Sequence, residues 1–237
     1  ATTQLSGHLG VPVKIGNVDI EWFNRLVLEG LYLEDQDGKV MFEANHVAAG
    51  FEIMPLLEGK FVFTTVRLFG FSFNLRKHTP QSPLNLQFVI DAFASKDSIK
   101  KEKNIDLRFN SIMIRRGNFS YNVDSEKETP GKFNAKHIDI KNLSAKISLK
   151  AFNKDSVNAH IKKMSFDEAS GFSLNKLSLN VVGNRDSAFV QDFEVRLPQT
   201  DLKIGLARID LSKIDSLPAL LNNAPIDLNI TPSQICL

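Results

Sequence analysis

The chain contains a single cysteine, Cys236, among its 237 residues. With one thiol, neither a disulfide within the chain nor a cysteine-based metal site can form. A lone cysteine is compatible with the cytoplasm and equally with a disulfide-free protein outside it. The cysteine content therefore leaves the cellular compartment open.

Tyrosine and tryptophan are scarce as well, with 2 Tyr and 1 Trp against 18 Phe. Tyr and Trp suit surfaces at which one end of the ring meets water, whereas Phe has no polar group. We therefore expect an apolar face that is either deeply covered or in contact with something equally apolar. A phenylalanine-rich core is the more ordinary of these two arrangements.

Strong charge and long apolar runs are also lacking. The formal net charge is +2, and no basic stripe with interleaved aromatics occurs, so we expect no nucleic-acid partner. The densest basic run, 96–103, contains two acidic residues and is typical of a solvated loop. No uncharged apolar run reaches the ~18 residues that a membrane-spanning helix needs. The chain starts at Ala1 without a signal-like segment, which indicates a piece of a longer protein.

Motifs that would carry catalysis or bind a metal are missing too. The histidines are scattered, without the spacing that would place two of them on one face of an element. No glycine-rich phosphate loop and no G-x-S-x-G elbow occurs. Acidic residues alternate singly with apolar ones, as in Ile105-Asp106-Leu107, which places them on the wet face of strands. We therefore predict that the protein is not an enzyme and has no metal site or cofactor.

The most informative stretch present is 61–75, FVFTTVRLFGFSFNL, where apolar residues fall at every second position. This pattern predicts a strand with one apolar face. The alternation slips twice, after Phe63 and after Leu68. Either a one-residue bulge or a tight turn would keep the apolar set on one face. Thr64-Thr65 favours a bulge, whereas Gly70 allows both. We predict a long, curving antiparallel sheet with one apolar face.

Other elements follow in order along the chain. The pattern of residues 1–10 predicts the end of a short helix with Gly10 as its cap. Residues 55–59 predict a single helical turn at most. Short strands are expected between these two segments. Residues 84–95 predict an inserted amphipathic helix, because apolar residues recur at helical spacing from Leu86 to Phe93. That helix either covers an open end or edge of the sheet or serves as a lid or membrane-facing element.

From residue 105 onward the chain is almost purely β and repeats the slipped alternation. The slips separate Phe109 from Ile112, Ile140 from Leu143, Leu174 from Leu177, and Leu197 from Leu202. Apolar runs start at about 30-residue intervals, at 107, 138, 172 and 202, which is typical of stacked supersecondary units. No domain boundary stands out, and we predict that 1–237 forms a single elongated β-rich unit.

Residues 9–60 resemble the beginning of the AsmA-like superfamily, in particular TamB-like translocation and assembly modules. The shared features are Gly10 with Pro12-Val13, Lys14-Ile15-Gly16-x-Val18, Leu31-x-Leu33-x-Asp35 with Asp37-Gly38, Phe51-x-Ile53-x-Pro55-Leu56-Leu57-x-Gly59-Lys60, and the following Val66-x-Leu68. Beyond residue 105 only the repetitive β style is similar. The insertion 84–104 looks like the versions found in Bacteroides-type bacteria.

This resemblance implies a U-shaped, taco-like trough whose concave face carries aliphatic and Phe side chains. It also implies a periplasmic location, with an inner-membrane anchor upstream of Ala1. Such proteins are thought to bridge the two membranes of a Gram-negative cell and to guide phospholipids outward. TamB-like members also assist outer-membrane protein assembly with a barrel partner, through C-terminal regions that we expect to lie outside this chain.

We therefore expect a phospholipid-binding module, since burying an acyl chain is favourable by about 0.8 kcal/mol per CH₂. The alternative is a structural or chaperone-like rod that pairs its sheet edges with strands of outer-membrane proteins. For each residue expected to line the groove, ordinary packing against a second layer is the competing interpretation. The expected lipid-binding residues are Phe61, Phe63, Leu68, Phe71, Phe73, Leu107, Phe109, Ile112, Ile114, Ile140, Leu143, Ile147, Leu149, Leu177, Leu179, Leu202 and Ile204.

Overall fold

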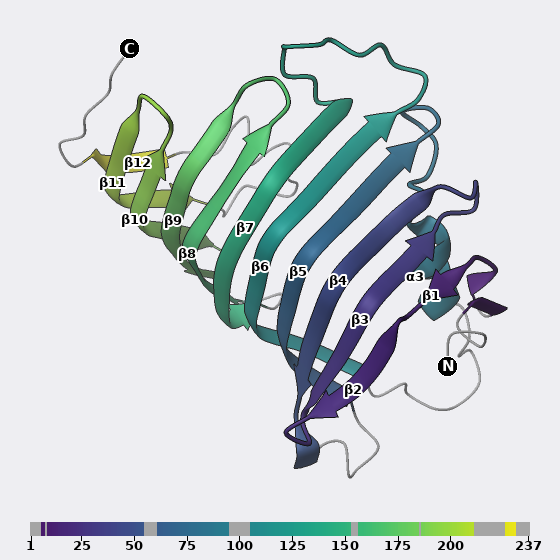
Figure 1. Ribbon diagram of the computed structural model, residues 1–237. Helices are drawn as coiled ribbons and strands as arrows, with labels where there is room; N and C mark the ends of the chain where they lie inside the picture. Colours follow the sequence, from purple (N-terminus) through teal and green to yellow (C-terminus); the bar gives the residue numbers. More distant parts are fainter. Residues whose placement is uncertain are drawn as a thin grey trace. The chain divides into compact units, whose positions relative to one another are not determined.

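The computed structural model describes residues 6–7, 9–54, 61–94, 105–152, 156–184, 186–210 and 226–230. These residues are mainly β, and their strands form one sheet (Figure 1). The prediction of a mainly β chain built on one sheet is confirmed. The trough-like cross-section stays a prediction.

The described residues contain twelve strands, and every pairing whose register is defined is antiparallel. Neighbouring strands follow the order β1-β3-β4-β5-β6-β7-β8-β9-β10-β11-β12, and β2 pairs with β3. Their bounds are β1 (Val13–Lys14), β2 (Asn17–Glu21), β3 (Arg25–Glu34), β4 (Val40–Phe51), β5 (Phe61–Lys77), β6 (Ile105–Val123), β7 (His137–Phe152), β8 (Ser156–Glu168), β9 (Ser173–Asn184), β10 (Ser187–Arg196), β11 (Asp201–Asp210) and β12 (Ile226–Ile230).

The chain divides into two compact units, which are described separately below. Unit 1 comprises Ala1–Phe109, Met113–Leu143 and Asp167–Phe172. Unit 2 comprises Asn110–Ile112, Ser144–Phe166 and Ser173–Leu237. The prediction of a single elongated unit over 1–237 stays a prediction.

Among the described residues, helical structure is confined to short segments of unit 1. The N–H of Gly10 donates to the carbonyl of Ser6 at 2.8 Å, and Gly10 has a φ of +70°, as a helix-capping glycine does. Helix α3 (Gln87–Ala94) lies inside the predicted range 84–95, and Ile90 of its apolar stripe is 50% exposed. The predicted helical turn at 55–59 lies outside the described residues. Within the described part of the chain, no helix is long and apolar enough to cross a membrane.

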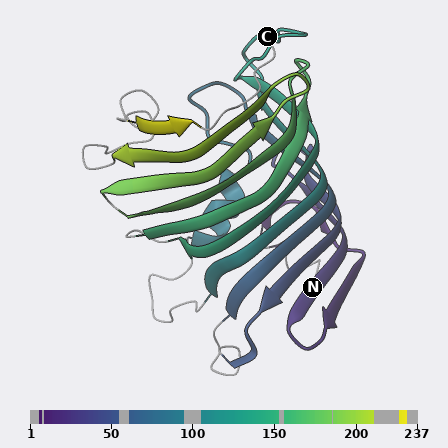
Figure 2. The same ribbon diagram turned by 90° about the vertical axis from the view of Figure 1, so that its left-hand side faces the viewer.

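Three of the slips in the alternation coincide with irregular backbone inside a continuous strand. Opposite β4, the register shifts by one residue at Thr64, which confirms the bulge predicted there. Gly70 has a φ of +59° while β5 continues past it, so the second slip is not a turn between two strands. Asn142, at the slip in β7, has a φ of +56°. Figure 2 shows several strands bent along their length.

The last slip has a different origin. Between Leu197 and Leu202 the chain makes a turn, closed by a 2.8 Å hydrogen bond from the N–H of Leu197 to the carbonyl of Thr200. The apolar runs that start at 107, 138, 172 and 202 belong to β6, β7, β9 and β11. The first interval therefore spans one strand and a loop, whereas the next two span two strands each. The two intervals after 138 thus match the expected repeat of strand pairs, whereas the interval from 107 to 138 has a similar length because a long loop takes the place of a second strand.

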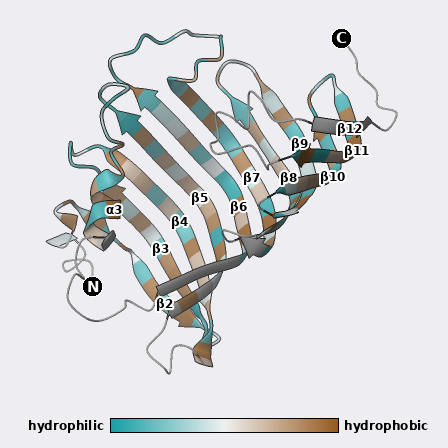
Figure 3. Cartoon of the chain, turned by 180° about the vertical axis from the view of Figure 1, so that it is seen from behind, coloured by the Kyte–Doolittle hydropathy of each residue, from teal (hydrophilic) through white to brown (hydrophobic). Residues whose placement is uncertain are grey.

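Few large side chains are buried among the described residues. Only Met41 and Val123 are fully buried large side chains there, and the buried apolar set contains five alanines and five valines. A sheet packed face to face against another layer would bury its large aliphatic and aromatic residues instead. Figure 3 shows that apolar and polar residues alternate along most strands.

Asp35 anchors the end of unit 1 at which β3, β4 and β5 meet. Its carboxylate is 2% exposed and accepts hydrogen bonds from Arg76 Nη2 at 2.9 Å and Asn85 Nδ2 at 3.0 Å. It also accepts bonds from the backbone N–H groups of Asp37 and Lys39. Burial raises the pKa of Asp35, but these hydrogen bonds and the Arg76 charge outweigh it, so its pKa lies below the ordinary value.

Replacing Asp35 by Ala should lower the free energy of unfolding at pH 7 by about 2 kcal/mol, since a buried charged hydrogen-bond network is lost. Because the folded-state pKa of Asp35 is depressed, its contribution is present above the unfolded-state pKa of about 3.9 and disappears as the pH falls through the folded value. Urea titrations from pH 7 downward should show that difference shrinking in acid. The control is Asp139→Ala, which removes the exposed pair with Lys141 and should change stability by about 0.5 kcal/mol or less. An equal effect of both substitutions would contradict the anchoring role.

Gly117 of β6 provides a second test of the fold. A Cβ built on Gly117 would lie 2.2 Å from Cε1 of Phe71, whose ring is 6% exposed and hence confined. Gly117→Ala should destabilise the protein by about 1–3 kcal/mol through overpacking. Gly7→Ala, where the added methyl meets nothing within 4 Å, should be neutral or slightly stabilising in the same urea titration.

Candidate functional site

In unit 1, strands β2 to β5 place apolar residues side by side in rows across the sheet. Directly paired residues project on the same face, so each row is a strip of apolar surface. We call the two rows together the unit 1 apolar face. The first row is Val18, Leu28, Val47 and Leu68, and the second is Ile20, Leu26, Ala49 and Val66.

The unit 1 apolar face is open. Val18 and Ile20 are 50% and 60% exposed, and the other members of both rows are half-buried. The intervening row on the opposite face contains Val27 and Ala48, which are buried at 4% and 2% exposure. On that face the protein's own atoms cover β3 and β4, whereas Asp19 and Arg67 at the two ends of the row are exposed. The apolar rows of the first face remain accessible.

The apolar rows of β3 to β5 continue on the far side of two glycines. Gly30 and Gly70 have φ values of +62° and +59°, a conformation that L side chains rarely adopt. Each glycine lies where the alternation slips, so the next apolar row follows three residues after the last one. The rows beyond the glycines are Leu31, Ala44 and Phe71, then Leu33, Phe42 and Phe73.

Aromatic rings gather in these continuing rows. The ring of Phe42 lies 6.2 Å from that of Phe71 and 5.7 Å from that of Phe73, and Phe73 meets Phe119 of β6 edge-on at 6.2 Å. Only Phe71 is buried, whereas the other three rings are half-buried. These edge-to-face and stacked contacts hold the rings in place while part of each ring remains accessible.

Polar residues line a groove of about 650 Å³ in unit 1. By strand alternation they face away from the neighbouring phenylalanines. Within the groove, Ser120 Oγ donates to Asn74 Oδ1 at 2.8 Å, and Glu168 accepts from the backbone N–H of Ser170 at 2.8 Å. The Ser170 hydroxyl also bonds Glu168 and, despite burial, lowers the pKa of its carboxyl. Its lining is mostly polar, with Val40 and Phe119 among the few apolar residues, so we do not assign it to the candidate site.

Unit 2 has the same division into an apolar and a charged face. Leu177, Val195 and Leu202 form one row across β9, β10 and β11. The neighbouring residues face the other way, where Lys176 Nζ lies 2.5 Å from Glu194 and Arg196 Nη2 lies 2.7 Å from it. The hydrogen bond from Lys176, joined by Arg196, lowers the pKa of Glu194 below its ordinary value although burial opposes this. The charged face is therefore internally paired and the apolar face is left free of charge.

A bulge in β10 keeps the apolar set of unit 2 on one face. Strand β9 alternates regularly and presents Leu177 and Val181 on the same side. Their partners in β10 are Val195 and Val190, which are five residues apart and would face opposite ways in a regular strand. The register shift at Asp192, whose φ is +52°, corrects the parity.

The structure places the residues predicted to bind lipid as follows. The side chains of Phe61, Phe63, Leu107 and Phe109 lie outside the described residues. Phe71 is buried at 6% exposure. The remaining ones are half-buried, neither sealed in a core nor free in solvent: Leu68, Phe73, Ile112, Ile114, Ile140, Leu143, Ile147, Leu149, Leu177, Leu179, Leu202 and Ile204.

Sequence reasoning missed the contribution of β2 to β4 to the unit 1 apolar face. Val18, Leu28 and Val47 lie in the segment for which the sequence predicts only short strands, and none of them is among the predicted lipid-binding residues. Their pairing with Leu68 through the antiparallel register joins them to it. The alternation in 13–33 was the available signal, but register cannot be read from one strand alone.

No cluster of three or more His, Cys, Asp or Glu side chains that could hold a metal occurs in the described ranges. No protein-family model matches this chain, and no curated protein is similar enough to match it. The apolar faces are therefore the features that bear on function.

Proposed function

We propose that this chain binds phospholipid acyl chains on its apolar faces and conducts them between membranes. The observation that supports this best is the unit 1 apolar face, where two complete rows of aliphatic residues remain accessible, while on the opposite face Val27 and Ala48 between them are buried. A face of this kind is unfavourable in water and is favoured by a ligand that is itself apolar.

The energetics fit a conduit better than a pocket. Each CH₂ group that leaves water contributes about 0.8 kcal/mol, without any directional contact. Successive rows, such as Leu28–Val47–Leu68 and Leu26–Ala49–Val66, offer similar surfaces one after another. An acyl chain can therefore move from row to row between positions of similar free energy, and no dedicated headgroup site is needed.

The resemblance of residues 9–60 to AsmA-like and TamB-like proteins supports the cellular setting of the proposal. In this setting the chain is the N-terminal periplasmic part of a protein anchored in the inner membrane upstream of Ala1. Its strands form a U-shaped trough, and a C-terminal region beyond this chain engages an outer-membrane barrel assembly protein. Phospholipid is then the ligand, and the protein transports it without catalysing a reaction.

A second candidate function is strand pairing with outer-membrane proteins. Among the described residues β2 pairs only with β3, so its other edge offers unpaired backbone groups. A rod that acts through its edges would bind extended peptides by β-augmentation and would need no lipid on its face. Mass spectrometry of ligands extracted from the purified chain separates the two functions, since only the first predicts co-purified phospholipid.

The lipid-binding proposal is tested by placing the same polar residue on opposite faces of β5. Leu68→Asn interrupts the apolar row, whereas Arg67→Asn changes the adjacent, exposed residue that faces the other side. Removing one Leu from the contact should weaken binding of a fluorescent fatty acid by about tenfold, and Arg67→Asn should leave it unchanged. Equal effects of the two variants, or binding unaffected by Leu68→Asn, would contradict the assignment of this face.

A further inference from the structure

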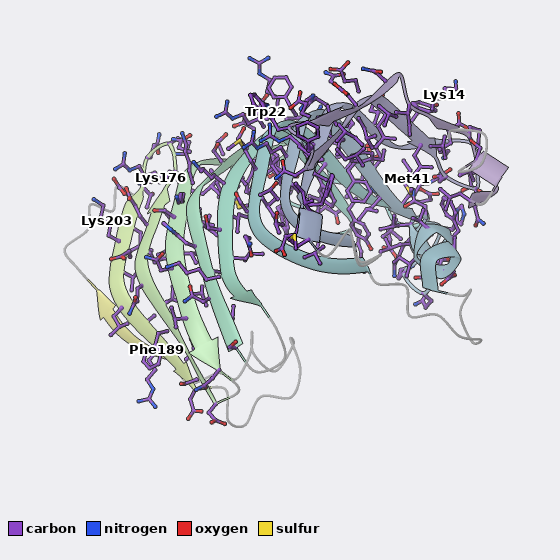
Figure 4. The ribbon with its side chains drawn as sticks, turned by 90° about the horizontal axis from the view of Figure 1, so that it is seen from below. Lys14, Trp22, Met41, Lys176, Phe189 and Lys203 are labelled. Atoms are coloured by element: carbon purple, nitrogen blue, oxygen red, sulfur yellow. The ribbon has the colours of Figure 1, made fainter. Side chains whose placement is uncertain are left out.

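Unit 1 carries a strongly exposed apolar cluster where β2 turns into β3. Trp22 and Phe23, in this turn, are 82% and 85% exposed. Ile53 and Met54, which follow β4, are 43% and 72% exposed. The two segments are tied together, because the N–H of Phe51 donates to the carbonyl of Asn24 at 2.8 Å. We call Trp22, Phe23, Ile53 and Met54 the aromatic tip, and Figure 4 shows Trp22 projecting at the periphery.

The turn that presents the two aromatic rings has a backbone conformation that is unfavourable for bulky residues. Trp22 and Phe23 have φ values of +53° and +63°. Tight hairpin turns with two positive φ values strongly prefer Asn-Gly and related pairs, and bulky residues rarely adopt this conformation. Backbone strain of this kind persists where the residues have a function. Here the strain exposes two large rings at the end of a hairpin.

The base of the tip carries charges of both signs, and the exposed Glu52 directly precedes Ile53. Glu21 and Arg25 flank the turn and pair with each other at 3.3 Å, and both are partly exposed. One carboxylate and one guanidinium, side by side, complement the ammonium and phosphate groups of a zwitterionic lipid headgroup. An anionic membrane would attract Arg25 but repel both Glu21 and Glu52.

We propose that the aromatic tip inserts into the interfacial layer of a zwitterionic phospholipid bilayer and positions the unit 1 apolar face to receive lipid. This role rests on the proposed function. Trp is enriched at membrane–water interfaces because its ring is amphipathic. The tip is continuous with the exposed Ile20 and Val18 of β2, the first members of the apolar rows. A lipid that leaves the bilayer at the tip therefore meets apolar surface at once.

Trp22 is the only tryptophan in the chain, so its fluorescence reports on the tip alone. The full chain is mixed with vesicles of phosphatidylethanolamine and phosphatidylcholine, and bound protein is separated by flotation. We expect the protein to float with the vesicles and the Trp22 emission to shift to shorter wavelength. Lipids brominated near the headgroup should quench this emission, and 0.5 M salt should leave binding within about twofold, because the attraction is apolar.

Phe23→Ser and Met54→Ser should each weaken vesicle binding by about tenfold, since each removes an apolar side chain that enters the bilayer. The matched control is Phe133→Ser, which removes a 66% exposed phenylalanine elsewhere in unit 1 and should leave flotation unchanged. All three side chains are exposed, so the variants should retain the circular dichroism of the parent chain.

The inference is overturned if the parent chain does not float, if it floats only with anionic vesicles at low salt, or if Phe133→Ser has the same effect as Phe23→Ser. A change from dimer to monomer in Phe23→Ser, with no vesicle binding by the parent chain, would show that the tip binds a second copy instead.

Leu68→Asn separates this inference from the proposed function. It should lose fatty-acid binding and keep flotation, whereas Phe23→Ser should keep fatty-acid binding and lose flotation.

Discussion

The apolar faces of both units depend on local breaks in the regular alternation of strand side chains. A strand that alternates without interruption turns its apolar set to the other face whenever the sequence slips by one residue. Gly30 and Gly70 in unit 1 and Asp192 in unit 2 adopt positive φ values at such slips. The backbone conformation at these few residues therefore decides whether each unit has one apolar face or two mixed ones.

Apolar surface that stays open to water contributes little to the free energy of folding, so other interactions must stabilise the sheet. Few large side chains are fully buried among the described residues, so the sheet gains little stability from a sealed core. Long antiparallel ladders, the Asp35–Arg76 network and the ion pairs around Glu194 contribute instead. Polar side chains on the opposite faces bond one another, as Ser120 does with Asn74. Stability and the proposed ligand binding are in this way assigned to different faces of the same strands.

The proposed transport role and the aromatic tip make use of two properties of apolar surface. The rows of β2 to β5 are broad and uniform, which suits an acyl chain that must move. The tip is small and protruding, and a strained turn presents it. Ile20 belongs to the last row before the tip, so the surface that would meet a bilayer leads directly to the surface that would hold a lipid.

The sequence by itself determined the mainly β fold, the bulge at Thr64 and the helix within 84–95, because alternation, turn residues and helical spacing are local properties. It did not reveal that residues such as Val18 and Leu28 belong with Leu68, or that Trp22 and Met54 lie on neighbouring segments. It also suggested a repeat from 107 to 202, which the strands follow only after 138. Strand register and the meeting of distant loops arise from long-range pairing, which only the tertiary structure decided.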